Sequence, residues 1–486
     1  MIAAIVSGCT VGPNFTRPPS PAVVGYDTVP IPLPPAGERD PAQRFADGAP
    51  VAERWWALFE SPALDDTVML ALAASPTLTT AQATLAQARE AVLVARANYY
   101  PQVDLVATGS WDHAQSLKGR SSRGSTPSSS GSTLVTDMFN IGPALTYSPD
   151  LFGHNRRLVE QQAALAENQR YQVAAAYLAL TADAATQAIT IASTQAQIKA
   201  VEDIIAADVR NLELVRIAFD AGSVARTDVL SAESQLAGDR TLLPPLQQQL
   251  AVARHALAVV GGKLPAEWSP PEFDLDALRL PAELPVTVPS ELVHGRPDIL
   301  AAETQLHAAS AAIGVATAQL YPSITISPAL TLQAVASGGP VAAPSLLAGF
   351  VGSIAQPLFH GGALRAQQRA AIDAYDAQRA TYRQTVLVAF GQVADVLRAL
   401  QHDADLLRAE DTALTASEAS LKLTQEAYAA GRGTLVQVLD AQRLYAQAVL
   451  GYARARGQRY LDTVLLFEAM GGAARMWLEA HAAAGP

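Results

Sequence analysis

Hydrophobic residues recur along most of this chain at steps of three and four, the spacing that lines one face of an α-helix. The pattern is clear from Ile198 to Phe219 and from Val438 to Tyr452. No proline occurs from Asn155 to Phe219 or from Gly362 to Ala429, so each segment can form one continuous helix. At 1.5 Å per residue such helices are about 100 Å long, and they must pack side by side.

Glycine and proline residues divide the helical pattern into separate segments. The helices predicted, in chain order, are about 64–97, 155–219, 225–262, 298–319, 362–429 and 434–470. Gly222 and Gly431 each follow a long helix and precede a return helix, which predicts two αα-hairpins with glycine turns. Pro244-Pro245 should kink or break the first return helix, because proline lacks an N–H. A soluble coiled-coil spacer would show the same periodicity.

A second pattern, the alternation of apolar and polar residues, predicts strands at about 101–112, 138–149, 322–333 and 346–358. In "SITISPALTL" (323–332), Ile324, Ile326, Leu330 and Leu332 point one way, and the Ser and Thr side chains point the other way. Strands of about ten residues tilted near 45° rise roughly 23 Å, close to the apolar belt of a transmembrane β-barrel. The strands of one chain cannot close a barrel, so a barrel would have to pool strands from several subunits. A soluble sheet buried under helices would alternate in the same way.

The two halves of the chain resemble each other. "NYYPQVDL" (98–105) is similar to "QLYPSITI" (319–326), and "AFDAGSVARTDVLSAESQL" (218–236) is similar to "AYAAGRGTLVQVLDAQRLY" (427–445). These similarities predict a diverged tandem duplication. The predicted organisation is a partial lipoprotein signal at 1–9, an extended N-terminal strap at 10–63, a first structural repeat at 64–290, a second at 291–472 and a C-terminal tail at 473–486.

The charge distribution narrows the choice of partners. The formal net charge is −11 and no Lys/Arg-rich run occurs, so no nucleic-acid partner is expected. No Asp, Glu, Lys or Arg occurs from Thr304 to Leu364. Ser, Thr, Gly and Pro interrupt this stretch too often for a transmembrane helix of about 20 apolar residues.

Cys9 is the only cysteine, so no intrachain disulfide and no cysteine-based zinc cluster can form. It ends the run Val6-Ser7-Gly8-Cys9, which resembles the lipobox of a bacterial lipoprotein. The run lacks a basic region and is shorter than a complete signal peptide, so a start further upstream is expected. The alternative is an unpaired thiol in a disordered tail.

No catalytic or nucleotide-binding signature occurs: there is no G-x-x-x-x-G-K-[ST], no H-E-x-x-H and no G-x-S-x-G. We therefore expect no enzyme activity and no cofactor. Glu303 and His307 stand four residues apart and could together hold a metal. Because no third ligand is apparent, a solvated pair on a helix is favoured and no metal is expected.

Together these segments resemble the outer-membrane efflux factors of the TolC family, in the lipoprotein branch (NodT type) that works with resistance-nodulation-division pumps. The matching segments are "GCTVGPNFTRP" (8–18), "WWALFESPALDDTV" (55–68), "SPDLFG" (148–153), "HGRPDILAAETQLHAASAAIGVATAQLYPSITIS" (294–327) and "AYAAGRGTLVQVLDAQR" (427–443). The resemblance extends from Cys9 to about Gly472.

The resemblance implies an α+β membrane protein: a homotrimer in which four strands per chain form a 12-stranded outer-membrane β-barrel, continued by a long periplasmic α-helical barrel. It implies a lipid anchor at Cys9, and it implies that Ile324, Ile326, Leu330 and Leu332 face outer-membrane lipid. The implied function is a passive duct that exports small molecules with a periplasmic membrane-fusion adaptor and an inner-membrane pump. A type I protein secretion duct and a lipid-anchored periplasmic coiled-coil scaffold are the alternatives.

The resemblance also implies a pore constriction at the second hairpin. Asp440 stands where the family projects an aspartate into the pore, whereas Gln437 replaces another acid one turn earlier. Tyr428 and Arg432 match positions associated with contacts that lock the tip shut. Alternatively, Asp440 is a solvated carboxylate on a helix face, and Arg432 is a cation that interacts favourably with a helix C-terminus.

Overall fold

The structure is a computed structural model that describes residues 10–23, 25–29, 31–34, 42–52, 54–115, 133–337, 343–472, 474 and 477–478. The chain divides into two compact units. The first comprises Met1–Thr16, Ala88–Ala166 and Gln305–Arg379, and the second comprises Arg17–Gln87, Glu167–Thr304 and Ala380–Pro486. Cys9 and the rest of the predicted signal lie outside the described residues, as does most of the predicted tail.

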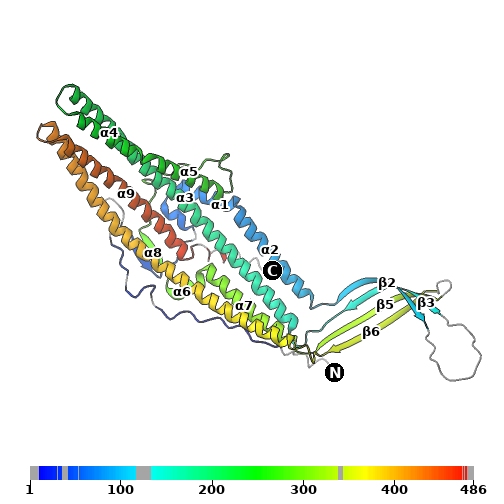
Figure 1. Ribbon diagram of the computed structural model, residues 1–486. Coiled ribbons are helices and arrows are strands. Elements are labelled where there is room, and N and C mark those ends of the chain that lie inside the picture. The colour runs from blue at the N-terminus through cyan, green and yellow to red at the C-terminus, as the bar shows by residue number, and fades with distance from the viewer. Residues whose placement is uncertain are drawn as a thin grey trace, which may run out of the picture. The chain divides into compact units, whose positions relative to one another are not determined.

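Helices make up most of the chain (Figure 1). They are α1 (Pro62–Ala74), α2 (Pro76–Ala97), α3 (His154–Asp220), α4 (Arg226–Arg240), α5 (Leu243–Val260), α6 (Pro289–Gly295), α7 (Pro297–Ala318), α8 (Ala363–Ala429) and α9 (Leu435–Ala469), with a short 3-10 helix at Trp55–Phe59. The strands are β1 (Arg44–Asp47), β2 (Gln102–Gln115), β3 (Thr133–Thr146), β4 (Glu283–Val286), β5 (Ser323–Ser337) and β6 (Ser345–Ala355).

The segment predicted as a single helix at 64–97 is two helices, α1 and α2, which meet at Ser75. Ser75 has an extended backbone with φ −66° and ψ 122°, because the residue before a proline is disfavoured in the α conformation. Among the described helices, none alone has the length and apolar composition to cross a membrane. Only α1 and α2 taken together reach that length and composition, and they are bent by 42°.

The first return helix breaks at Thr241-Leu242, just before the two prolines that predicted the break. Pro244 and Pro245 lie in the first turn of α5. Backbone N–H groups in a first turn have no partner within the helix, so the N–H that proline lacks costs no helical hydrogen bond. The predicted helix at 225–262 is therefore the pair α4 and α5.

In the first unit, β2, β3, β5 and β6 form an antiparallel sheet in that order, which leaves β2 and β6 as its edges (Figure 1). Strand β3 begins at Thr133, earlier than the predicted 138, and β5 extends to Ser337. Strand β6 ends at Ala355 rather than at 358, because Pro357 cannot donate to a strand ladder.

In the second unit, the N-terminal strap is not extended throughout, contrary to the prediction, because it contains a 3-10 helix. Part of the strap also forms a short strand. Strand β1 pairs in parallel with β4, with Arg44 opposite Glu283 and Asp47 opposite Val286. This pair was not predicted from the sequence, because each strand is only four residues long. The 3-10 helix that follows was also not foreseen.

The 3-10 helix carries three buried aromatic side chains into the core of the second unit. The Trp55 ring stacks on Phe467 of α9 at 5.2 Å between centroids, and Phe59 stacks on Tyr460 at 6.2 Å. Trp56 is buried, and its Nε1 donates to Asp65 Oδ1 over 2.9 Å, which satisfies its one polar atom. Ala474 and Leu478, from the predicted tail, pack against Ala174 and Leu178 of α3.

Helices α3 and α9 approach closely in the second unit at Gly457. A Cβ placed on Gly457 would lie 2.0 Å from Oγ and 2.7 Å from Cβ of Ser193. No rotation of the serine side chain moves its Cβ, so any larger residue at 457 must push the two helices apart.

We predict that Gly457→Leu lowers the free energy of unfolding by about 2 kcal/mol through overpacking. The measurement is denaturant-induced loss of helical circular dichroism of the purified protein in detergent. Gly238→Leu is the matched control, because nothing lies within 4 Å of a Cβ at Gly238 on α4. Equal stability of the two variants would contradict the close approach, and adding Ser193→Gly should recover part of the loss.

Candidate functional site

The four-stranded sheet has one almost entirely apolar face. Val103 pairs with Leu145, Ile141 with Leu332, and Ile324 with Ile354, and paired residues share a face. The face comprises Val103, Leu105, Ala107, Gly109 and Trp111 of β2, Phe139, Ile141, Pro143 and Leu145 of β3, Ile324, Ile326, Pro328, Leu330, Leu332 and Ala334 of β5, and Leu346, Ala348, Phe350, Gly352 and Ile354 of β6. Asp137 is the charged exception.

This apolar face is exposed rather than covered. Leu105 is 75% exposed, Phe350 72% and Ile354 73%. The sequence alternative of a soluble sheet buried under helices of its own chain is therefore wrong. Soluble proteins rarely expose so much contiguous apolar surface, which instead marks contact with a membrane or another protein.

The opposite face of the sheet carries most of its polar groups. Ser323, Thr325, Ser327 and Thr331 of β5 lie on it, as do Asp104 and Asp112 of β2. Gln333 Nε2 donates to Asn140 Oδ1 over 3.0 Å, which joins β5 to β3 across this face. Val106, Leu347 and Val351 are apolar residues on the same face, so its polarity is lower than that of an ordinary protein surface.

Each of the two hairpins is turned by a glycine in the left-handed conformation. Gly431 has φ 68°, its N–H donates to the Tyr428 carbonyl over 2.9 Å, and the Arg432 N–H donates to the Ala427 carbonyl over 2.9 Å. Gly222 has φ 72°, and the same two bonds recur around it. This pair of bonds is a Schellman motif, which satisfies carbonyls at a helix end and needs a residue with positive φ.

The predicted constriction residues cluster around the second turn but have different surroundings. Tyr428 is partly buried against the apolar cluster at the hairpin ends, whereas Arg432 is exposed. Gln437 Oε1 accepts from the Thr434 N–H over 2.8 Å, and the Gln437 N–H donates to Thr434 Oγ1 over 3.3 Å, so Gln437 caps the start of α9. Asp440 is exposed and paired with Arg443 at 2.7 Å.

The two hairpins pack against each other at their ends. Leu212 and Val215 of α3, Val229 and Ala232 of α4, and Leu435 of α9 form one buried apolar cluster. Asn211 Nδ2 on α3 also donates to Gln442 Oε1 on α9 over 3.1 Å. Helices α4 and α9 are thus held together chiefly near the turns.

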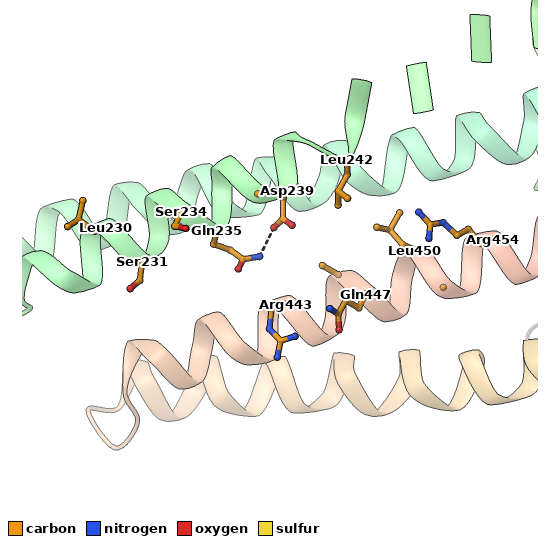
Figure 2. Close-up of a pocket in the computed structure, with 13 residues that line it drawn as sticks. Leu230, Ser231, Ser234, Gln235, Asp239, Leu242, Arg443, Gln447, Leu450 and Arg454 are labelled. Carbon is orange, nitrogen blue, oxygen red and sulfur yellow. Dashed lines mark hydrogen bonds between the residues drawn. The ribbon is translucent and has the colours of Figure 1, made fainter. Parts of the chain in front are cut away.

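Further from the turns, α4 and α9 diverge and leave a groove of about 910 Å³ (Figure 2). Ser231, Gln235 and Asp239 of α4 line one wall, and Arg443, Gln447 and Arg454 of α9 line the other (Figure 2). The Gln235 amide donates to Asp239 Oδ2 over 2.8 Å. The groove therefore carries an acidic group on one wall and basic groups on the other, and leucine side chains also line it.

Two pairs of neighbouring carboxyl groups, each with at least one buried member, were not predicted from the sequence. Asp208 of α3 lies beside Asp239, and Asp403 of α8 lies beside Asp462 of α9. Burial and the neighbouring carboxyl raise the pKa of Asp208 to about 7 and that of Asp403 to about 8. A usable signal existed, because Asp208 stands on the apolar stripe of its helix that contains Val201, Ile204 and Leu212.

The first residues of the strap, 10–16, are attached within the first unit. Arg157 is buried, its Nε donates to the Val11 carbonyl over 3.2 Å, and its Nη2 donates to Asn14 Oδ1 over 2.8 Å. Phe15 stacks on His307 at 4.5 Å between ring centroids. The residues directly after the predicted lipidation site are therefore held in place.

Glu303 and His307 have separate partners. Glu303 Oε1 accepts from Arg17 Nε over 2.6 Å in the second unit, and His307 Nε2 lies 3.0 Å from Glu160 Oε1 in the first. Among the described residues, no group of three or more His, Cys, Asp or Glu side chains could hold a metal ion.

Strands with one apolar and one polar face, leading along the chain into long helical hairpins, define an outer-membrane channel protein. Residues 67–263 and 288–472 match the outer membrane efflux protein family. The toluene efflux pump outer membrane protein TtgC of Pseudomonas putida is 27% identical over 479 residues, which span 97% of this chain and 94% of that protein. The pyoverdine export outer membrane protein OpmQ of Pseudomonas putida is 30% identical over 461 residues, spanning 93% and 94%.

The fold is likewise similar to that of a solved channel. The outer-membrane channel OprN superimposes with a TM-score of 0.82 at 26% identity, covering 96% of this chain and 99% of that one. Because the family match spans most of the chain, the chain belongs to the outer membrane efflux protein family. The family and the outer-membrane location predicted from the sequence are confirmed.

We predict that Gly431→Ala destabilises the second hairpin by about 1 kcal/mol, because a Cβ is disfavoured at positive φ. Gly431→Asn should be milder, since asparagine tolerates this conformation. Hydrogen exchange of residues 425–437 is the measurement. Gly391→Ala inside α8, where a Cβ meets nothing within 4 Å, should not destabilise and serves as the control. Equal protection in Gly431→Ala and the parent would refute the role of the turn.

Proposed function

We propose that the protein is a passive outer-membrane duct, assembled from three copies of this chain, that exports small molecules. The proposal extends the family assignment to an assembly, a path and a cargo class. Its single strongest support is the four-stranded sheet, whose apolar face is largely exposed and whose edge strands β2 and β6 each pair with one strand among the described residues.

In lipid every backbone N–H and C=O needs a partner, so a sheet that spans a membrane has to close. Edge strands β2 and β6 each have only one neighbour. Three copies would pair each β6 with the β2 of the next copy and yield a 12-stranded barrel, the number that the sequence resemblance implies. Ile324, Ile326, Leu330 and Leu332 would then face lipid, and the polar face would line the duct.

The ends of the edge strands support such a pairing. Strand directions alternate across the sheet, so β6 of one copy would run antiparallel to β2 of the next. The chain just after β6 would then meet the chain just before β2. Leu358 and Phe359 are 91% and 88% exposed, and Tyr100 is 69% exposed. Burying these side chains between copies would remove from water the two most exposed large apolar side chains among the described residues, Leu358 and Phe359, together with Tyr100.

We predict that Phe359→Cys combined with Tyr100→Cys forms disulfides between copies. Non-reducing electrophoresis of membranes should show dimer and trimer bands that disappear with reductant. Each single variant is a control for Cys9. A control pair, Ile354→Cys on β6 with Ile141→Cys on β3, should give none, because β3 is not an edge. Failure of the first pair to link, or linkage in the second, would contradict the proposed pairing.

Asp440 is proposed as a pore-lining residue, with Tyr428, Arg432 and Gln437 around it. The carboxylate is exposed and forms an ion pair with Arg443 at 2.7 Å. Three copies near an axis would attract cations and repel one another. Opening would follow an outward movement of the hairpin ends, an iris-like change in how α4 and α9 pack.

We predict that Asp440→Asn lowers the preference for cations over anions in planar bilayers. Arg443→Gln should raise it, because it leaves the Asp440 charge without its partner. Reversal potentials in a salt gradient give both results. If the two variants shift the potential in the same direction, or not at all, Asp440 does not line the constriction.

The partners are proposed on the same basis. A periplasmic adaptor and an inner-membrane resistance-nodulation-division pump would drive the cargo, while the chain itself performs no chemistry. The relatives described above are named for toluene efflux and pyoverdine export, and neither compound is a protein. Their names favour small molecules over a type I secretion substrate as the cargo. The exposed apolar sheet argues against a purely periplasmic scaffold.

Lipidation of Cys9 is proposed as a second membrane attachment. The family resemblance around "GCTVGPNFTRP" (8–18) supports it, and so does the fixed position of the residues that follow, which Arg157 holds through Val11 and Asn14. An acyl chain on each of three copies would make the anchoring stable.

A further inference from the structure

Each helical hairpin holds one pair of carboxyl groups between its outgoing and its return helix. In the first hairpin Asp208 of α3 lies within hydrogen-bonding reach of Asp239 of α4. In the second, Asp403 of α8 lies within reach of Asp462 of α9. The pairs stand at different positions along their hairpins, so the likeness is one of chemistry rather than of repeated sequence.

The second pair is withdrawn from water, with Asp403 8% and Asp462 6% exposed. In the first pair Asp208 is 3% exposed, whereas Asp239 is only partly buried and lies on the wall of the groove. The Oδ2 atoms of Asp208 and Asp403 are buried and receive no hydrogen bond from any other described group. An ionised carboxylate is only an acceptor, so two carboxyl groups bond to each other only if one of them carries a proton.

The surroundings supply little positive charge for the first pair. Gln235 of α4 donates to Asp239, and Asn211 of α3 is bonded to Gln442 of α9. Across the groove α9 presents Arg443, which is paired with Asp440, and Arg454, which donates to Gln197. Desolvation and Asp239 together raise the pKa of Asp208 to about 7.

The second pair faces one cation. Arg459 of α9 lowers the pKa of Asp403, but its Nε donates to Gln43 of the strap, and desolvation and Asp462 outweigh it. The Gln458 amide donates to Asp462 Oδ1 over 3.1 Å. The pKa of Asp403 is raised to about 8 as a result.

We propose that a shared proton closes each hairpin, between Asp208 and Asp239 in the first and between Asp403 and Asp462 in the second, so that acid tightens the hairpins and alkali loosens them. Proton loss leaves two neighbouring negative charges, at least one of them buried, and parting of the helices relieves the repulsion. The hairpins would then respond to the pH of the compartment that they face.

Proton linkage gives the direction and the size of the expected effect of pH on the packing of the helices. A carboxyl whose pKa is raised in the packed state stabilises packing at low pH, and the stabilisation is lost as the pH rises through that pKa. With the pKa at 3.8 in the parted state and about 7 or about 8 in the packed state, raising the pH from 6 to 8 favours parting roughly ten-fold at Asp208 and roughly fifty-fold at Asp403.

The test is hydrogen–deuterium exchange of the full-length protein in detergent at pH 6 and pH 8, corrected for intrinsic exchange rates. Peptides covering 200–215 and 396–410 should exchange at least ten-fold faster at pH 8 in the parent protein. In Asp208→Asn with Asp403→Asn this pH response should vanish, because asparagine keeps the shape and donates a hydrogen bond at every pH.

Asp203→Asn with Asp405→Asn is the matched control, because it removes one charge from each of the same helices at exposed positions. It should retain the parent's pH response. A parent protein with no pH response overturns the proposal even if the Asn variant does not fold, and so does a folded Asn variant that keeps the response. Both pairs lie within one chain, so the outcome is independent of barrel closure.

Discussion

The unpaired edges of the four-stranded sheet are the constraint on which the rest of the account depends. A sheet with an exposed apolar face belongs in lipid, but its edge strands β2 and β6 present backbone groups that lipid cannot satisfy. Lipid can cover the apolar face, but the described strands of one chain do not pair these two edges. In the proposed assembly a neighbouring copy supplies the missing partners.

The helices meet a different requirement, because they must hold their ends together and still be able to part. Apolar packing in the cluster that includes Leu212 and Leu435 holds the hairpin ends together. Polar and charged groups are concentrated further along the hairpins, in the groove between α4 and α9 and at the carboxyl pairs. Such a division places apolar contacts next to the turns that glycine makes sharp and charged groups on the adjoining helical faces.

Much of the fold could be predicted from the sequence, because it rests on local periodicity. The alternation in 323–332 and the uninterrupted helical spacing in 363–429 each reflect neighbours a few residues apart. The break at Ser75 was missed because one X-Pro step was outweighed by the pattern on both sides. The β1–β4 pair was missed because it joins two very short segments far apart in the chain, and no local signal reports such a pairing.

Site residues were predictable where they mark a turn and less so where they act in pairs. Gly222 and Gly431 were identified because only their backbone conformation matters. The role of Gln437 as a helix cap could also have been predicted, since Thr434 precedes it by three residues. The place of Asp208 on an apolar stripe was visible in the sequence, but its pairing with a second acid was not, because a single acid on such a stripe does not reveal what it faces.

The central claim, that the open sheet is completed by two further copies, is tested most directly by native mass spectrometry of the protein extracted from membranes in detergent. The account predicts one species that contains three chains of 50.9 kDa, with any lipid on Cys9 added to each and any signal residues removed. A monomer or dimer that persists in gentle detergents as the membrane-extracted form would contradict it.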